Sequence, residues 1–206
     1  MDAPKTLAGE SERAARTALL SQSHVKDLVH LVERMRSAKG PGYDIPNFDP
    51  LDGGTDAQVL FLLEAPGPKA ITSGFVSRNN PDETAKNFFL LNVEAGIDRR
   101  RTLTWNAVPW YIGSGTKIRA ARRDDVREAD EWLTELLGTL DQLRIVVFVG
   151  QKPLHAQGVV RSSRPKVEIM ASPHPSPMFI NRASGNRNRV LAVLQELSAR
   201  LAASDA

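Results

Sequence analysis

The chain has 206 residues, of which 41% are hydrophobic and 25% are charged, and it carries a formal net charge of +3. This length and composition are typical of a globular protein, so we expect a single domain over residues 1–206. The sequence contains no cysteine, which excludes disulfides, zinc fingers, cysteine nucleophiles and iron–sulfur clusters held by thiolates.

The first quarter of the chain predicts a helix followed by a long loop. Residues 1–10 are expected to be disordered, as chain ends often are. Apolar residues recur at roughly helical spacing over residues 11–38, and Gly40-Pro41-Gly42 would end that helix. Residues 40–57 contain four glycines and three prolines, which indicates a structured loop without regular elements.

From residue 58 onward, short apolar runs alternate with helical patterns. Strands are expected over residues 58–63, 102–108, 144–150 and, with a weaker pattern, 167–171. Helices are expected over residues 85–95, 124–140 and 185–201, and residues 201–206 are expected to be disordered. This alternation predicts an α/β fold whose parallel sheet is covered by helices on both faces.

Three polar residues follow predicted strands and are candidates for a common site. Glu64 follows the first strand, Asn106 ends the second, and His174 follows the fourth. Ligands of parallel sheets bind beyond the carboxyl ends of the strands. We therefore expect these three side chains to converge on one edge of the sheet.

His174 lies in the segment Pro173-His-Pro-Ser-Pro177. Prolines fix the backbone, so the segment is stiff and its side chains are held in place. The imidazole could donate a hydrogen bond to an oxygen that gains negative charge, and Ser176 could bind a phosphate. The alternative is a proline-rich turn with a structural histidine.

Glu64 and Asn106 each have a chemical and a structural interpretation. The Glu64 carboxylate could position water or stabilise a cation, or it could be a solvated end of the strand. Gly67 would allow a ligand to approach the backbone closely. The amide of Asn106 offers a donor and an acceptor, which match the N3–H and O4 edge of uracil, but it could also cap the strand.

Aromatic and basic residues could contact a nucleic acid. Phe75 lies on a predicted loop and could stack on a base or cover the core, and the same choice applies to Trp110 and Tyr111. Met178-Phe179 could wedge into a base stack or pack locally. Residues 151–206 carry eight Lys or Arg against three acids, which indicates either a phosphate-binding surface or a solvated one.

Between Pro46 and Arg182, four segments in order resemble motifs of the uracil-DNA glycosylase superfamily. They are Leu63-Glu-Ala-Pro-Gly67, Ser73-Gly-Phe-Val-Ser77, Asn106-Ala-Val-Pro-Trp110 and His174-Pro-Ser-Pro177. The resemblance implies a three-layer α/β/α fold with a central four-stranded parallel sheet. It also implies that the target nucleotide leaves the duplex and enters the site.

The resemblance also implies roles for individual residues. The catalytic residues would be His174, which donates to O2 of the leaving base, and Glu64. Uracil would be bound by Ala65, Phe75, Asn106 and His174. DNA would be bound by Pro66, Gly67, Pro68, Ser176, Met178 and Arg182, with Met178 filling the gap left by the flipped base.

The chain departs from the family pattern at two points. Ala65 stands where the best-known branch has a water-positioning Asp. The branches with the most similar first motif usually hold an iron–sulfur cluster through cysteines, and this chain has none. We expect no lysine beside the motifs, so a Schiff-base lyase step is not expected.

The expected function is therefore a monofunctional DNA repair glycosylase that releases uracil and leaves an abasic site. The alternatives are a glycosylase for another deaminated or mismatched base and a non-catalytic binder of uracil or abasic DNA. The four histidines lack metal-site spacing, so neither a metal nor a cofactor is expected. The sequence has no apolar run long enough for a membrane span and no signal core, which favours a cytoplasmic monomer acting on uracil-containing DNA, with no membrane partner.

Overall fold

The computed structural model describes residues 2–114 and 117–203, and its centre is a four-stranded, all-parallel sheet. The strand order is β4 (Thr102–Asn106), β2 (Val59–Leu63), β7 (Ile145–Val149) and β8 (Glu168–Ser172). The α/β fold with helices on both faces of a parallel sheet is therefore confirmed, and so is each of the four expected strands.

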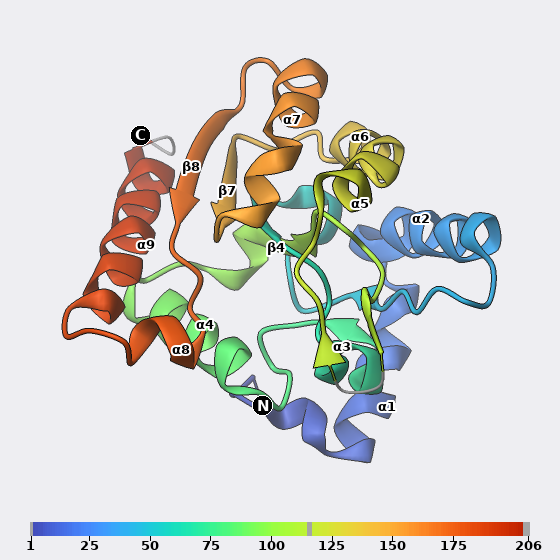
Figure 1. The fold of residues 1–206 in the computed structure, drawn as a ribbon, viewed down its shortest axis with the longest axis horizontal. Coiled ribbons are helices and arrows are strands. Elements are labelled where there is room, and N and C mark those ends of the chain that lie inside the picture. Colours follow the sequence, from blue (N-terminus) through green and yellow to red (C-terminus); the bar gives the residue numbers. More distant parts are fainter. Residues whose placement is uncertain (1, 115–116, 204–206) are drawn as a thin grey trace.

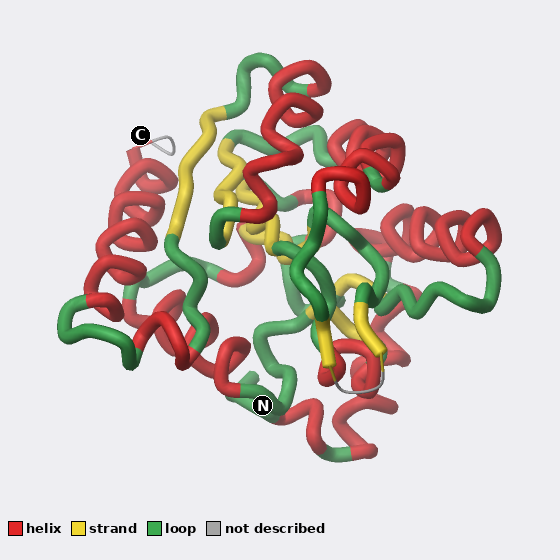
Figure 2. Tube along the Cα trace, in the orientation of Figure 1, coloured by secondary structure: helices red, strands yellow, loops and turns green. Residues whose placement is uncertain are grey.

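Alternating side chains of the strands face two different helical layers. Val59 and Phe61 of β2 pack towards α4 (Glu83–Glu94) and α9 (Asn186–Ala203). Leu60 and Leu62 face the other way, towards α2 (Ser23–Lys39), α6 (Asp130–Thr139) and α7 (Gln157–Ser163). Figures 1 and 2 show α9 on one side of the sheet and α2 and α6 on the other. Both faces of the strand are buried, which explains its continuous apolar sequence.

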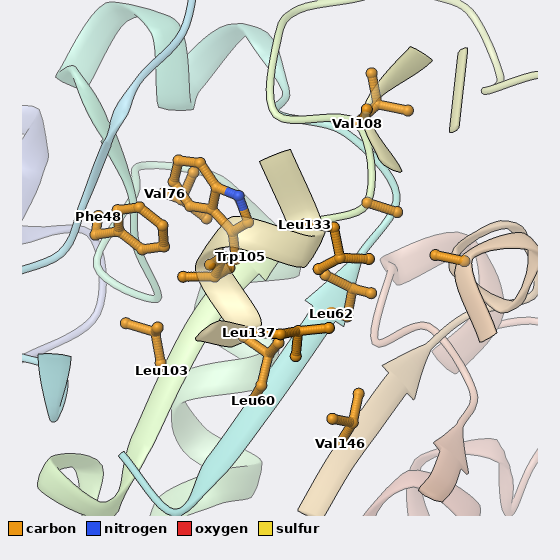
Figure 3. Close-up of a cluster of buried hydrophobic side chains, with 14 of the residues drawn as sticks. Phe48, Leu60, Leu62, Val76, Leu103, Trp105, Val108, Leu133, Leu137 and Val146 are labelled. Carbon is orange, nitrogen blue, oxygen red and sulfur yellow. The ribbon is translucent and has the colours of Figure 1, made fainter. Parts of the chain in front are cut away.

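The larger core lies between the sheet and α2 and α6 (Figure 3). There, Phe48 stacks on Trp105 with a ring-centroid distance of 3.6 Å. Leu133 and Leu137 of α6 lie beside Leu60 and Leu62 of β2. Trp105 belongs to β4, so this cluster holds the outer strand against the helical layer.

Short elements join these layers. The remaining α-helices are α1 (Glu10–Ala18), α3 (Pro68–Ser73), α5 (Arg123–Glu128) and α8 (Pro177–Ile180). Two-residue strands form the pairs β1 (Asn47–Phe48) with β3 (Phe75–Val76), and β5 (Gly113–Ser114) with β6 (Lys117–Ile118). Single 3₁₀ turns occur at Thr6–Ala8, Leu19–Ser21, Gly54–Asp56, Arg99–Arg101 and Lys152–Ala156.

The expectation that both chain ends are disordered is wrong for the described residues. Leu7 is only 1% exposed, and its N–H donates to the carbonyl of Asn79. At the other end α9 continues to Ala203, because Leu201 still contributes to the core, and residues 204–206 lie outside the described part. Buried apolar side chains order both ends.

Three other boundaries differ from the sequence prediction. The helix expected over 11–38 is two helices, because Gln22 is extended between α1 and α2. The helix expected over 124–140 is divided at Ala129 into α5 and α6. The loop expected over 40–57 contains β1 and a 3₁₀ turn. Apolar periodicity continues across both helix breaks, so it could not reveal them. The elements within 40–57 are only two and three residues long, too short to give a periodic pattern.

A buried loop closes the open edge of β4. The N–H of Gly53 donates to the carbonyl of Thr102 at 2.8 Å, and the N–H of Thr104 donates to Asp52 Oδ2 at 3.1 Å. A Cβ on Gly53 would lie 2.0 Å from the carbonyl oxygen of Arg100, so only glycine fits at this point. The loop thus gives hydrogen-bond partners to backbone groups of β4 that an open edge strand would leave unpaired.

Asp49 and Asp52 in this loop are fully buried with arginines. Arg16 Nη1 lies 2.6 Å from Asp49 Oδ1, and Arg99 reaches Asp49 at 2.5 Å and Asp52 at 2.7 Å. Burial alone would raise the pKa of Asp49, but Arg99 and Arg16 hold it below the usual range. Burial outweighs the arginines at Asp52, whose pKa is raised.

None of the helices described is long and apolar enough to cross a bilayer.

We expect Arg99→Met to lower the free energy of unfolding by about 3–5 kcal/mol, because it leaves buried carboxylates without their main partner. Urea denaturation of the wild type and the variant measures this change. Arg34→Met is the matched control, since Arg34 pairs with Glu135 on the exposed surface. A surface pair contributes about 0–1 kcal/mol, so equal losses in the two variants would contradict the expectation.

Candidate functional site

A cavity of about 460 Å³ lies at the carboxyl ends of β2 and β4. Its wall comes from the turn after β2, the loop between β3 and α4, the end of β4, the segment 118–120 and His174. Its size lies within the usual range of small-molecule sites. Seven residues singled out from the sequence line it together: Glu64, Ala65, Pro66, Gly67, Pro68, Asn106 and His174.

Four other expected site residues do not line this cavity. Phe75 is 1% exposed in β3, and its neighbours Val76 and Ser77 line the cavity instead. The aromatic ring in the wall belongs to Phe88 of α4. Ser176, Met178 and Arg182 lie on or beside α8. Because none of the four lines the cavity, their proposed contacts with uracil or DNA stay predictions.

The α8 region presents one large apolar side chain to the outside. Ser176 begins the helix and accepts a hydrogen bond from the N–H of Phe179, and Met178 is 83% exposed. Phe179 packs against the core between the sheet and α9, with the Arg189 guanidinium 5.6 Å from its ring centre. Phe179 therefore packs locally, whereas Met178 is exposed.

Some aromatic and basic residues have structural partners. Trp110 is buried beside Tyr43 and Lys39, which excludes it from an open site. Arg187 pairs with Glu94, and Arg164 donates to carbonyl oxygens at the end of α6. The basic C-terminal segment is thus partly used within the protein.

His174 is held between two neighbouring elements. Asn87 Nδ2 on α4 donates to the carbonyl of Pro175 at 3.0 Å. Gly150, after β7, has φ +94°, and a Cβ at that position would lie 3.4 Å from His174 Cβ. The positive φ favours glycine there, whereas a Cβ at 3.4 Å would be in ordinary van der Waals contact with His174. The imidazole therefore sits on a rigid support at the cavity.

The burial of His174 favours the neutral form of its ring. Burial lowers the pKa of His174, although the Glu64 and Asp82 carboxylates oppose the shift. Since the lowered pKa lies below the ordinary value of about 6.5, the ring is neutral at pH 7. A neutral imidazole can donate a hydrogen bond through one nitrogen.

Glu64 is tied to two later segments. Its Oε1 accepts from the N–H of Ala121 at 2.6 Å, and its carbonyl accepts from the N–H of Val108 at 3.0 Å. These bonds hold the turn after β2 against the end of β4 and the segment that follows β6. Ala65 packs against the core and supplies no polar group to the cavity.

Unsatisfied polar atoms gather at this cavity. Within residues 2–114 and 117–203, five buried side-chain nitrogen or oxygen atoms have no hydrogen-bond partner. Three of them belong to cavity-lining residues: Arg78 Nε, Thr104 Oγ1 and Asn106 Nδ2. An unpaired buried polar atom costs about 1–3 kcal/mol, so such a cluster indicates a place where a ligand supplies the missing partners.

Sequence reasoning missed several residues of the wall. Thr104 is two positions before Asn106 in the same strand, so the period of two could have identified it. Asp82 caps α4 by accepting from the N–H of Ala85, and burial raises its pKa. Its place before a helical pattern was a capping signal. Arg78 gave no sequence signal, because only the fold of its loop brings it to the cavity.

Lys69 also lines the cavity, directly after Pro68 of the first motif. The expectation that no lysine lies beside the motifs is therefore wrong, although the Lys69 side chain is exposed to solvent. Over the described ranges, no three His, Asp or Glu side chains are grouped so that they could hold a metal ion.

Comparison with known proteins gives a family and similar folds. The sequence matches the Uracil DNA glycosylase superfamily over residues 50–198. No curated protein matches it. The fold is similar to the NMR structure of a candidate uracil DNA glycosylase from Methanosarcina acetivorans, with a TM-score of 0.50, 18% identity and coverage of 71% of this chain and 93% of that one. The crystal structure of mimivirus uracil-DNA glycosylase has a TM-score of 0.41 and 18% identity, and the match covers 85% of this chain and 72% of that one.

We expect Glu64→Gln to lower the pKa of His174 further, because the Glu64 carboxylate stabilises the charged imidazolium. An NMR titration of the histidine ring signals, from acidic to neutral pH, measures the shift. Glu94→Gln is the control, since Glu94 is exposed and pairs with Arg187. A His174 pKa that rises or stays constant in Glu64→Gln would refute the electrostatic coupling.

Proposed function

The chain belongs to the Uracil DNA glycosylase superfamily, and on that premise we propose that it is a monofunctional glycosylase acting on deoxyuridine in DNA. It hydrolyses the N-glycosidic bond, releases uracil and leaves an abasic site. The observation that carries the proposal is a single cavity where the unsatisfied amide of Asn106 meets His174 and Glu64.

Base recognition is assigned to the end of β4. Asn106 is 3% exposed, and its Nδ2 has no hydrogen-bond partner in the described part of the chain. A flipped uracil would give that donor a carbonyl oxygen, and the amide oxygen could accept the ring N3–H. A site built around such a pair rejects bases that leave it unsatisfied.

Bond cleavage is assigned to His174 and Glu64. As the glycosidic bond breaks, negative charge develops on the base, and the neutral His174 ring donates a hydrogen bond to O2. Donors fixed in a site with little water stabilise such charge strongly. Glu64 positions the attacking water: its Oε1 is occupied by Ala121, which fixes the carboxylate and leaves Oε2 for water.

DNA contacts are assigned to the rim of the cavity and to α8. Pro66, Gly67, Pro68, Ser176 and Arg182 lie close to the DNA backbone in this proposal. The exposed Met178 fills the space that the flipped nucleotide leaves, as apolar side chains inserted into a duplex do.

The decisive experiment uses a duplex oligonucleotide with one uracil, treated with alkali after incubation. We expect strand scission at the uracil, because alkali cleaves the abasic site. A panel with thymine mismatches, ethenocytosine and hypoxanthine tests the range of bases. Retardation of the DNA in a gel without scission would identify a non-catalytic binder. A covalent enzyme–DNA adduct that forms after borohydride treatment and is lost in Lys69→Ala would show a lyase step.

His174→Ala should lower the single-turnover rate of uracil release by about 10²–10³, as loss of one oxyanion donor does. His155→Ala is the control, because His155 does not line the cavity described above. Uracil release by His174→Ala at the wild-type rate would overturn the assignment of His174.

Glu64→Gln should lower the same rate by about 10²-fold, the lower range for loss of a catalytic acid or base. The Gln side chain can still accept from Ala121, so the turn after β2 is retained. Asp82→Asn is compared because Asp82 also lines the cavity. Loss in Asp82→Asn with a normal rate in Glu64→Gln would transfer water positioning to Asp82.

A further inference from the structure

Arg78 is a buried cation in the wall of the cavity. Its residue is only 3% exposed, and it lies in the loop between β3 and α4. Its guanidinium carbon is 5.5 Å from the ring centre of Phe88, which also lines the cavity. A buried charge needs a compensating partner, so the contacts of Arg78 indicate what the site lacks.

The protein compensates Arg78 incompletely. Nη2 donates to Thr102 Oγ1 at 2.8 Å, but Nε is 3.9 Å from Asp52 Oδ1 and makes no hydrogen bond to a described residue. Asp52 instead binds Arg99 at 2.7 Å. A charged N–H donor of a cavity-lining residue is therefore left without a hydrogen-bond acceptor.

The ion pairs of the buried cluster also show that Arg78 lacks a close carboxylate partner. The fully buried carboxylates of Asp49 and Asp52 are surrounded by Arg16, Arg78 and the mostly buried Arg99. Arg99 also pairs with the more exposed carboxylate of Asp2. Arg16 and Arg99 both lie within hydrogen-bond distance of a carboxylate, whereas Arg78 does not. Arg78, which lines the cavity, is thus the arginine of this cluster whose charge is least compensated by a carboxylate.

An anion in the cavity would use this charge, and glycosidic cleavage produces one. Resting on the function proposed above, we propose that Arg78 is a further catalytic residue, whose Nε–H donates to a carbonyl oxygen of the departing base. The guanidinium stabilises the negative charge of that base. The unpartnered hydroxyl of Thr104, which lines the same cavity, offers a second donor.

The step balances as a hydrolysis. The C1′–N1 bond breaks and its electron pair stays on the base, spread over N1 and the ring carbonyl oxygens. Water forms the new bond to C1′ and gives its proton to Glu64. The base anion is later protonated at N1 by solvent, Glu64 returns its proton to solvent, and Arg78 keeps its protons throughout.

The test compares two leaving groups, uracil and 5-fluorouracil, in otherwise identical duplexes. Fluorine stabilises the ring anion, so the fluorinated base depends less on help from the enzyme. Arg78→Gln should lower the single-turnover rate about 100-fold for uracil, as loss of one charge-stabilising donor does, but about 10-fold or less for 5-fluorouracil. Arg78→Lys retains the charge and should lie between the wild type and Arg78→Gln.

Arg16→Gln is the matched control. Arg16 belongs to the same buried cluster but does not line the cavity as described. It should change both rates by one common factor, which is the signature of a structural role. The same common factor in Arg78→Gln would overturn the proposal, whereas a wild type that releases neither base would overturn the proposed function itself.

A measurement on the wild type covers the case in which the Arg78 variants do not fold. Protein labelled with ¹⁵N-arginine is titrated with free 5-fluorouracil near its ring ionisation, and the arginine Nε–H signals are followed by NMR. A shift of one slowly exchanging, buried Nε–H signal is expected. If no such signal moves while the base binds, the proposal fails.

Discussion

The structure depends on the carboxylate of Asp52, which is buried where three parts of the chain meet. One oxygen accepts the N–H of Thr104 and so completes the open edge of β4. The other binds Arg99, which also holds Asp49 and Asp2. A buried carboxylate cannot be left unpaired without a large cost, so the surrounding arginines have little freedom. The N-terminal region, the loop before β2 and the loop before α4 are thereby fixed to one another.

The cavity follows from this arrangement because its wall is built from the same segments. Thr104 and Asn106 belong to the strand that Asp52 borders, and Arg78 belongs to the loop held by Asp49 through Ser77. His174 is placed from the other side, by Asn87 and the close approach of Gly150. Polar groups fixed in this way need not reorganise when charge develops, which is the condition for strong electrostatic stabilisation.

The division of charge around the cavity is suited to the departure of an anion. His174 is neutral because burial lowers its pKa, so it contributes a hydrogen bond rather than a full charge. The side chains of Glu64 and Asp82 also line the cavity. Ala65 carries no carboxylate, and in the proposed mechanism Glu64 takes the water-positioning role.

The sequence by itself determined the sheet, most helices and the convergence of three polar residues at one edge of the sheet. Continuous apolar runs bounded by Gly and Pro identified the strands, because a strand buried on both faces must be apolar throughout. The carboxyl ends of parallel strands share one edge, which is why Glu64, Asn106 and His174 could be expected together. Local pattern and topology were sufficient for these conclusions.

Only the tertiary structure decided where charged and loop residues lie. Arg16, Asp49, Arg78 and Arg99 are far apart in sequence and resemble ordinary surface charges, yet the fold buries them in one cluster. The ordered N-terminus has the same origin, since Leu7 is fixed by a distant loop. Burial and ion pairing between remote segments have no sequence period, so neither the partners of these arginines nor the place of Arg78 in the cavity could be obtained without the fold.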